Sequence, residues 1–388
     1  APGWIVDALL DRRLAFFRSD WPHFRSVPAV TLESPNVIVL STGLSIEAGI
    51  DGALDWTRGF DRDISSNVHD FYSLSYVGRL LSAYEDLGEI TLLDSALGMV
   101  RSFIDFIKEP DRLQMFVTNR GFSSADHSTS IRASVLIKLL QILGGDDVLR
   151  RKERALIERV TSHLWDIGDF LAEPANIYPS NHGIMACLTL AQVANAFGEL
   201  GYVCDQYLRQ ANSSLMRLIR ASFDRDGWAN ENTVGYHSFI LRLLRDYLEY
   251  CSKNGLAAEE VRDLEGYLAR GEQALSFCVR QDGRIPPIGD SPLYRSGIDS
   301  INHSKFFPES GFLVIKDDSL YVSLVCGSRS DNHKQVDDSS LTLHYGGEDL
   351  IVDGGSYCYD STDPFRKYLV SFRGHSGVFS EAVADLTA

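Results

Sequence analysis

The chain has 388 residues, of which 44% are hydrophobic and 23% are charged, and its formal net charge is −16. These values indicate a folded protein with one large and one smaller domain, or two of similar size. The acidic balance argues against a nucleic-acid-binding protein, because neutralising phosphates requires clustered Lys and Arg. The sequence has no apolar run of about 18 residues and no basic segment followed by an apolar core, so we expect neither a membrane span nor a signal peptide within it.

Residues 1–60 show no regular period, and we expect them to form an irregular segment that packs on the helices that follow. From residue 61 apolar residues recur with the period of a helix. Helical stripes are predicted at residues 69–87, 127–145, 152–171, 182–198, 203–223, 234–250 and 257–279. Helices of this length joined by short loops predict stacked antiparallel hairpins over residues 61–300.

Prolines and glycines in residues 281–292 mark a change of pattern. After about residue 308 apolar residues alternate with a period of two, and two strand–turn–strand patterns follow at residues 311–327 and 340–355. These patterns predict an antiparallel β domain over residues 301–388. About 80 residues make a thin independent sandwich, so this domain is expected to pack on the helices or to belong to a longer protein.

Four polar constellations lie in three separate regions of the chain: Asn181-His182, Tyr236-His237, His333 with Asp337, and Asp353 followed by His375. Each has a structural explanation when taken alone. Ser180 or Asn181 can cap a helix, Tyr236 can belong to an apolar core, and a loop histidine can be solvated. Taken together, they are what an active site between two domains would look like in sequence.

The same segments resemble the heparinase II/III superfamily of polysaccharide lyases, which includes alginate lyases. The similar stretches, in chain order, are DWTRGFDRD, ADHSTSIRASVLIKLL, SNHGIMA, ENTVGYHSF, NHKQVDDSSLTLHYGGEDLIVDGGSYCYD and RKYLVSFRGHSGV. The resemblance implies an α+β multidomain protein with an incomplete α/α toroid followed by an antiparallel β-sandwich. The chain ends soon after the last of these motifs, so the sandwich is expected to be small or truncated.

The resemblance also implies cleavage of a uronic-acid polysaccharide by β-elimination. Asn181 and His182 would neutralise the uronate carboxylate beside the carbon that loses a proton, aided by the helix N-terminus. Tyr236 would protonate the leaving oxygen. His333 would be the partner base or would lower the effective pKa of Tyr236, and either Tyr236 or His333 would take the C5 proton. Matching positions suggest that Glu231, Arg366 and Tyr368 bind substrate.

Family members commonly hold a structural zinc ion, and the matching positions here are Gln335, Asp353 and His375. Glutamine is a poor zinc ligand, so the resemblance predicts a weak or empty metal site and no required cofactor. Ser376 also stands where the family usually has asparagine.

We expect an acidic polysaccharide or oligosaccharide as partner, no nucleic acid, and a periplasmic or secreted location. Two other functions stay open. The first is a non-catalytic protein that binds acidic glycans or handles a capsule. The second is a glycoside hydrolase on an α/α toroid, which would need two carboxylates such as Glu231 and Asp290.

Overall fold

A computed structural model of the chain describes residues 35–61, 63–112, 125–198, 202–255, 259–328 and 330–379. The chain divides into two compact units: unit 1 lies within Ala1–Leu215 and Glu249–Glu260, and unit 2 within Met216–Leu248 and Val261–Ala388. Unit 2 contains helices as well as the main sheet. None of the helices described is long and apolar enough to cross a membrane.

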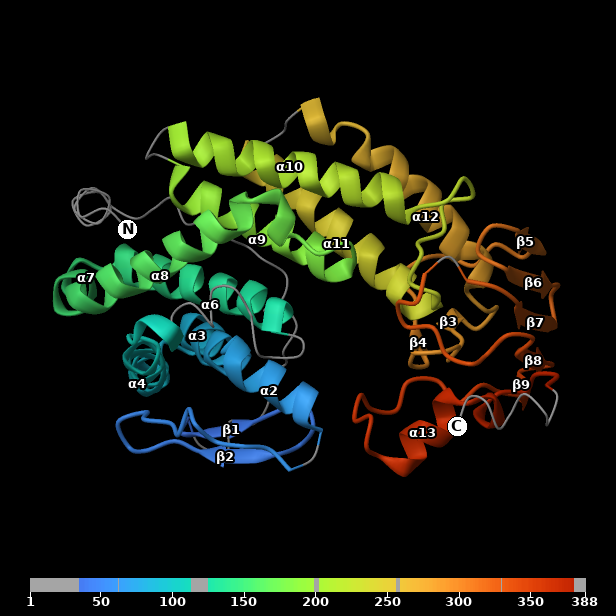
Figure 1. Cartoon of the computed structure of the whole chain (residues 1–388), viewed down its shortest axis with the longest axis horizontal. Coiled ribbons are helices and arrows are strands. Elements are labelled where there is room, and N and C mark those ends of the chain that lie inside the picture. Colours follow the sequence, from blue (N-terminus) through green and yellow to red (C-terminus); the bar gives the residue numbers. More distant parts are fainter. Residues whose placement is uncertain are drawn as a thin grey trace. The chain divides into compact units, whose positions relative to one another are not determined.

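The helices follow the order predicted from the apolar period (Figure 1). Their bounds are α2 Ile64–Ser73, α3 Ser75–Leu87, α4 Ile90–Phe106, α6 Ala125–Gly145, α7 Asp147–Lys152, α8 Arg154–Ala172, α9 Asn181–Ala196, α10 Tyr202–Ser222, α11 Val234–Lys253, α12 Leu264–Cys278 and α13 Pro364–Val370. Single 3₁₀ turns lie at Pro174–Asn176, Glu259–Val261 and Phe372–Gly374. The predicted helical part followed by an antiparallel sheet is confirmed, whereas a toroidal arrangement of the helices stays a prediction.

In unit 1, α6 packs against α2, α3, α8 and α9. The stripe predicted as one helix at residues 69–87 forms two helices, because Leu74 takes a left-handed backbone with φ of 57° and ends α2. The sequence-based prediction omitted α4, in which nine of 17 residues are buried. Gly98 of α4 touches the carbonyl group of Asp51, where a β-carbon would clash.

The segment expected to be irregular contains a short hairpin within its described part. Strands β1 (Val37–Val39) and β2 (Ser45–Glu47) pair antiparallel, with Ile38 opposite Ile46. Both isoleucines are buried, which explains why so short a ribbon holds its register. Residues 1–34 of the predicted segment lie outside the described residues.

In unit 2, five antiparallel strands form one sheet in the order β5-β6-β7-β8-β9 (Figure 1). The strands are β5 Lys305–Phe307, β6 Phe312–Lys316, β7 Leu320–Val325, β8 Leu341–Tyr345 and β9 Glu348–Ile351, and a two-residue ribbon pairs β3 Arg284–Ile285 with β4 Tyr294–Arg295. The two predicted strand–turn–strand patterns are confirmed as β6–β7 and β8–β9. Sequence analysis missed β5 and α13.

One face of the sheet is tied to the end of α12. The buried Lys316 Nζ donates hydrogen bonds to the carbonyl oxygens of Phe277 and Val279, at 3.0 and 2.7 Å. The hydroxyl group of Tyr321 donates to the carbonyl oxygen of Cys278. These bonds satisfy carbonyl groups that a helix C-terminus leaves open, so the sheet itself caps α12.

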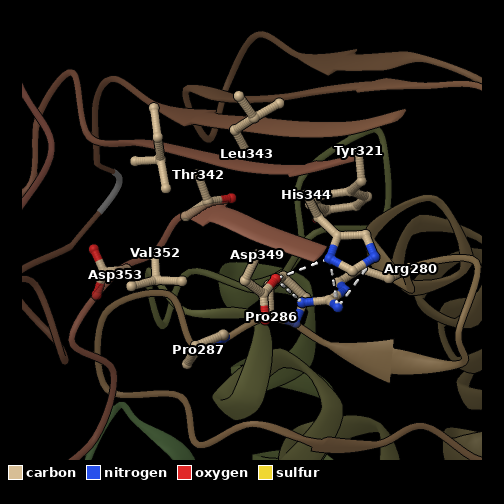
Figure 2. Close-up of a pocket in the computed structure, with 11 residues that line it drawn as sticks. Arg280, Pro286, Pro287, Tyr321, Thr342, Leu343, His344, Asp349, Val352 and Asp353 are labelled. Atoms are coloured by element: carbon tan, nitrogen blue, oxygen red, sulfur yellow. Dashed lines mark hydrogen bonds and ion pairs between the residues drawn. The ribbon is translucent and has the colours of Figure 1, made fainter. Parts of the chain in front are cut away.

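An ionic cluster around Arg280 makes a second connection between the end of α12 and the sheet (Figure 2). The guanidinium group of Arg280 donates to Asp349 at 2.7 Å and to Asp282 at 3.0 Å, and it contacts the His344 ring at 2.8 Å. The cluster lies beside a small pocket under the β8–β9 hairpin. Because its charges are already paired with one another, we assign this cluster to the fold.

Candidate functional site

Tyr236 lies in the first turn of α11. The side chain of Thr233 accepts a hydrogen bond from the backbone N–H of Tyr236 at 3.0 Å, as an N-cap does. The Tyr236 hydroxyl lies 2.7 Å from the Tyr359 hydroxyl. The ring of His333 stacks on the ring of Tyr236, with centroids 3.4 Å apart and planes 18° apart. Unit 2 therefore brings together three side chains that are up to 123 positions apart in sequence.

His333 is held in an unusual backbone conformation. Its φ of 52° lies in the left-handed region, which few non-glycine residues adopt and which is often found at functional sites. The side-chain amide of Asn232 donates to the carbonyl oxygens of Ser330 and Asn332, both at 2.8 Å. Ser330 in turn donates to the carbonyl oxygen of Asn230. The loop carrying His333 is thus fastened to the segment that leads into α11.

The carboxylate of Asp290 is surrounded by donors. One oxygen accepts from Arg366 at 2.7 Å and from Gln335 at 2.6 Å, and the other lies 3.3 Å from Nδ1 of His333. Burial would raise the pKa of Asp290, but the hydrogen bonds from His333 and Arg366 outweigh it and lower that pKa. Asp290 is therefore held as an ionised acceptor.

The three predicted substrate-binding residues have different surroundings. Glu231 is 1% exposed, and its carboxylate lies 3.7 Å from Nε2 of His333, which favours a role in holding His333. Arg366 binds Asp290, and its guanidinium carbon lies 5.3 Å over the ring of Tyr359. Tyr368 is 50% exposed and remains accessible to a ligand.

The two hydroxyl groups have different proton affinities. Burial, followed by the neighbouring Tyr359, raises the pKa of Tyr236 well above its ordinary value of 10.0. Burial and the charge of Asp290 raise the pKa of Tyr359 to about 12, while its hydrogen bond with Tyr236 and the cation of Arg366 pull that pKa down. The two phenols share one hydrogen bond, so when one of them is ionised the other stays protonated, and the cation of Arg366 over the Tyr359 ring favours ionisation at Tyr359.

The structure differs from the expected relation between His333 and Tyr236. The ring nitrogens of His333 face Asp290 and Glu231, while its ring face covers Tyr236. Burial and the neighbouring Tyr359 raise the pKa of Tyr236, and the expected lowering of that pKa by His333 stays a prediction. A stacked ring offers no hydrogen bond to the phenol oxygen it covers.

Asn181 and His182 belong to unit 1, so their approach to Tyr236 stays a prediction. They begin α9, and Ser180 is its N-cap, since the serine side chain accepts from the N–H of His182 at 3.1 Å. Asn181 is 1% exposed, and the ring of His182 contacts the ring of His127, with centroids 3.8 Å apart and planes tilted by 31°. A small pocket beside His182 is lined by Thr129, Ser130, Phe170, Leu171, Asn176, Tyr178 and Ala186.

The predicted metal ligands do not form a zinc site. Asp353 accepts a hydrogen bond directly from Nδ1 of His375 at 2.7 Å and another from Ser340 at 3.2 Å. The side-chain amide nitrogen of Gln335 donates a hydrogen bond to Asp290. Two buried atoms of this set, the amide oxygen of Gln335 and Nε2 of His375, have no hydrogen-bond partner among the residues described. We assign no chemical step to a metal here.

The structure adds two residues to the site that sequence analysis did not place there. Tyr359 lies in SYCYD, inside a quoted motif, but nothing in the residue pattern singled out its phenol. Asp290 was considered only as a carboxylate for glycoside hydrolysis. Its oxygens are occupied by Arg366, Gln335 and His333, so Asp290 is poorly suited to donate a proton in glycoside hydrolysis.

Comparisons with known proteins agree with the resemblance. The family model described as heparinase II/III-like, C-terminal, matches residues 301–382. No curated protein sequence matches the chain. Among solved structures, a heparinase III superposes with a TM-score of 0.67 and 16% identity over 96% of this chain and 62% of its own. The heparan sulfate lyase HepC from Pedobacter heparinus gives 0.57 and 14% over 96% and 64%.

A second heparinase III, with methylated lysines, gives a TM-score of 0.62 and 15% identity over 94% of this chain and 64% of its own. This chain therefore spans less than two thirds of the length of these structures. At such identities the likeness establishes the fold. The chain shares the fold of heparinase III, and its residues 301–382 carry a heparinase II/III-like C-terminal domain.

Proposed function

We propose that the protein is a polysaccharide lyase that cleaves a glycan containing uronic acid by β-elimination. The observation that carries the proposal is the hydrogen bond between the phenols of Tyr236 and Tyr359, with the guanidinium group of Arg366 over the Tyr359 ring. Eliminating a 4-O leaving group requires one group that takes the C5 proton and one that gives a proton to the departing oxygen. A pair of this kind supplies both from adjacent positions.

Tyr359 is assigned as the base and Tyr236 as the acid. The minor phenolate form of Tyr359 takes the C5 proton, the C5–H electrons form the C4–C5 double bond, and the C4–O4 bond breaks. Tyr236 then gives its proton to O4. Across their 2.7 Å hydrogen bond, Tyr359 can return a proton to Tyr236 and restore the starting state. This assignment replaces Tyr236 or His333 as the base, because the ring nitrogens of His333 face carboxylates instead.

Arg366 supports this assignment. Its guanidinium group lies over the Tyr359 ring and lowers the Tyr359 pKa, which favours the phenolate that must form. His333 covers the other phenol and fixes the plane of its ring. Asn181 and His182 are proposed to neutralise the uronate carboxylate, so that the enolate-like intermediate is stabilised where charge accumulates.

The test is incubation of the purified full chain with alginate, heparan sulfate, hyaluronan and bacterial exopolysaccharides. A lyase produces an unsaturated uronate that absorbs ultraviolet light and is absent from hydrolase products. We expect this absorbance with at least one polymer and none from Tyr236→Phe. Binding without product would instead support a non-catalytic glycan-binding protein, and new reducing ends without the absorbance would support a hydrolase.

A further inference from the structure

The turn at Gly289–Pro292 lies at the centre of the unit 2 site. Asp290 is 5% exposed and Ser291 is fully buried. Gly289 has a φ of +58°, a backbone conformation that favours glycine and that sets the direction of the turn. Buried polar side chains need hydrogen-bond partners, and those of Asp290 and Ser291 lie in the segments that carry the proposed site residues.

Asp290 determines how His333 is held. An ionised carboxylate can only accept hydrogen bonds, so the 3.3 Å contact requires that Nδ1 of His333 carries the hydrogen. That bond fixes the tautomer and the plane of the imidazole ring. The same plane lies against Tyr236 at 3.4 Å. The position of the proposed acid therefore depends on the carboxylate through the histidine.

Asp290 also places the cation of Arg366. The guanidinium group donates to Asp290 at 2.7 Å and lies 5.3 Å over the ring of Tyr359. Gln335 fills the remaining space on the same oxygen with its amide at 2.6 Å. A buried charge-assisted pair of this kind is stronger than a neutral hydrogen bond and fixes direction. The cation beside the proposed base is thus held by the carboxylate that also holds His333.

Ser291 joins the two tyrosine-bearing segments. Its hydroxyl oxygen accepts from the N–H of Gly235 at 2.7 Å, and its carbonyl oxygen accepts from the N–H of Ser356 at 3.2 Å. A β-carbon at Gly235 would lie 2.9 Å from the Ser291 hydroxyl, and one at Gly355 would lie 2.8 Å from its carbonyl oxygen. The backbone before Tyr236 and the backbone before Tyr359 therefore both touch one serine.

We infer that Asp290 and Ser291 are the positioning residues of the reaction: Asp290 orients His333 and Arg366, and Ser291 sets the spacing of Tyr236 and Tyr359. This inference rests on the proposed function, since it names what aligns the proposed acid and base. Neither residue touches the reacting atoms. A displacement of about 1 Å in such groups can cost on the order of 10²-fold in rate, so their removal acts on turnover more than on binding.

The first experiment compares Asp290→Ala and the near-isosteric Asp290→Asn with the wild-type full chain on the polymer that it cleaves best. We expect kcat to fall about 10²-fold or more while KM changes less than about threefold. Sodium formate, a small carboxylate that fits the space left in Asp290→Ala, should restore at least about a tenth of the lost rate, and sodium chloride should not. Ser291→Ala should lower kcat less and should not respond to formate.

Two results would overturn the inference. One is a wild-type kcat in folded Asp290→Ala or Asp290→Asn. The other is a loss that formate does not restore and that accompanies a lowered melting temperature, which would make Asp290 a residue of the fold alone.

A second readout needs no turnover and separates this inference from the proposed function. In protein labelled with ¹⁵N-histidine, with His333→Gln used for assignment, nuclear magnetic resonance reports which ring nitrogen of His333 carries hydrogen. We expect a protonated Nδ1 in the wild type and loss of that preference in Asp290→Asn. An unprotonated Nδ1 in the wild type would overturn the role of Asp290, even if the chain proves to cleave no glycan.

Discussion

The two polar regions of the molecule are built from different chemical groups. In unit 2, the phenols of Tyr236 and Tyr359 adjoin the carboxylate of Asp290. In unit 1, the start of α9 presents Asn181 and His182, and none of the residues that line the pocket described beside His182 is acidic. Groups that exchange protons need neighbours that separate their pKa values, whereas groups that bind an anion need donors without competing negative charge.

Because of this difference, we expect the two regions to contribute different steps of the reaction. We expect the unit 2 network to control proton transfer and the start of α9 to control recognition of the uronate carboxylate. Substitutions in the two regions should therefore affect different kinetic parameters or differ in their response to pH.

Tyr236→Phe removes the proposed acid and leaves the aromatic ring in place. We expect kcat to fall about 10³–10⁴-fold, near the upper end of what general acid–base catalysis provides. Circular dichroism and the melting temperature should match the wild type, because the ring still stacks on His333. Tyr359→Phe should cause a loss of similar size, and wild-type turnover in either variant would remove that tyrosine from the mechanism.

Arg280→Met disrupts the ionic cluster under the β8–β9 hairpin and serves as a contrast within the same unit. It leaves the partly exposed carboxylates of Asp349 and Asp282 without their buried cation, so we expect the free energy of unfolding to fall by about 1–3 kcal/mol. Urea titration measures this loss. Below the new melting temperature, kcat should stay near the wild-type value, and a selective loss of kcat would show that the cluster belongs to the site.

Asn181→Ala removes the amide proposed to neutralise the carboxylate. We expect kcat to fall about 10²–10³-fold, as when one oxyanion donor is removed. Ser180→Ala is the matched control, because it removes the N-cap of α9 and should cost about 0.5–2 kcal/mol of stability with little change in rate. If Ser180→Ala loses as much rate as Asn181→Ala, the Asn181 effect reflects the helix start and not recognition.

His237 follows Tyr236 directly in the chain, and we assign it to the core and not to the site. It is fully buried, stacks on Trp228, and its pKa is lowered to about 4 by burial. The unfolded chain takes up the proton near pH 6.5 and the folded chain only near pH 4. Stability is therefore complete above pH 6.5 and falls as the pH drops toward 4, by on the order of 3 kcal/mol.

Urea titrations at pH 7 and at about pH 4.5 measure this effect. His237→Gln should be less stable at pH 7 but should lose less on acidification than the wild type. An equal acid-side loss in both proteins would contradict the assignment of His237 to the core.

Chelation should have the smallest effect. Asp353 is paired directly with His375, and Gln335 is bound to Asp290, so we expect EDTA dialysis to leave both kcat and the melting temperature unchanged. Restoration of lost activity by zinc after dialysis would show that these residues hold a metal after all.

Local patterns predicted most of the helices and the central strands, because apolar residues at a period of 3.6 or 2 decide which face is buried. They failed where one residue changed the chain direction, as at Leu74, and they omitted α4 although apolar residues recur along it. The period of apolar residues does not reveal a residue with a left-handed backbone conformation within a continuous apolar stripe.

Only part of the site was predicted from the sequence. Tyr236, His333 and Arg366 were named, and the structure brings them together within unit 2. Tyr359 and the role of Asp290 depend on contacts between residues 43–123 positions apart, which no local pattern contains. The raised pKa of Tyr236 likewise follows from burial, a property of the folded chain.

The most direct test is a crystal structure of the Tyr236→Phe full chain soaked with a uronate oligosaccharide that the wild type cleaves. We predict that the uronate carboxylate accepts hydrogen bonds from Asn181 or His182, with O4 beside residue 236 and C5 within about 3.5 Å of the Tyr359 oxygen. A glycan bound with its scissile bond away from both positions would contradict the proposal.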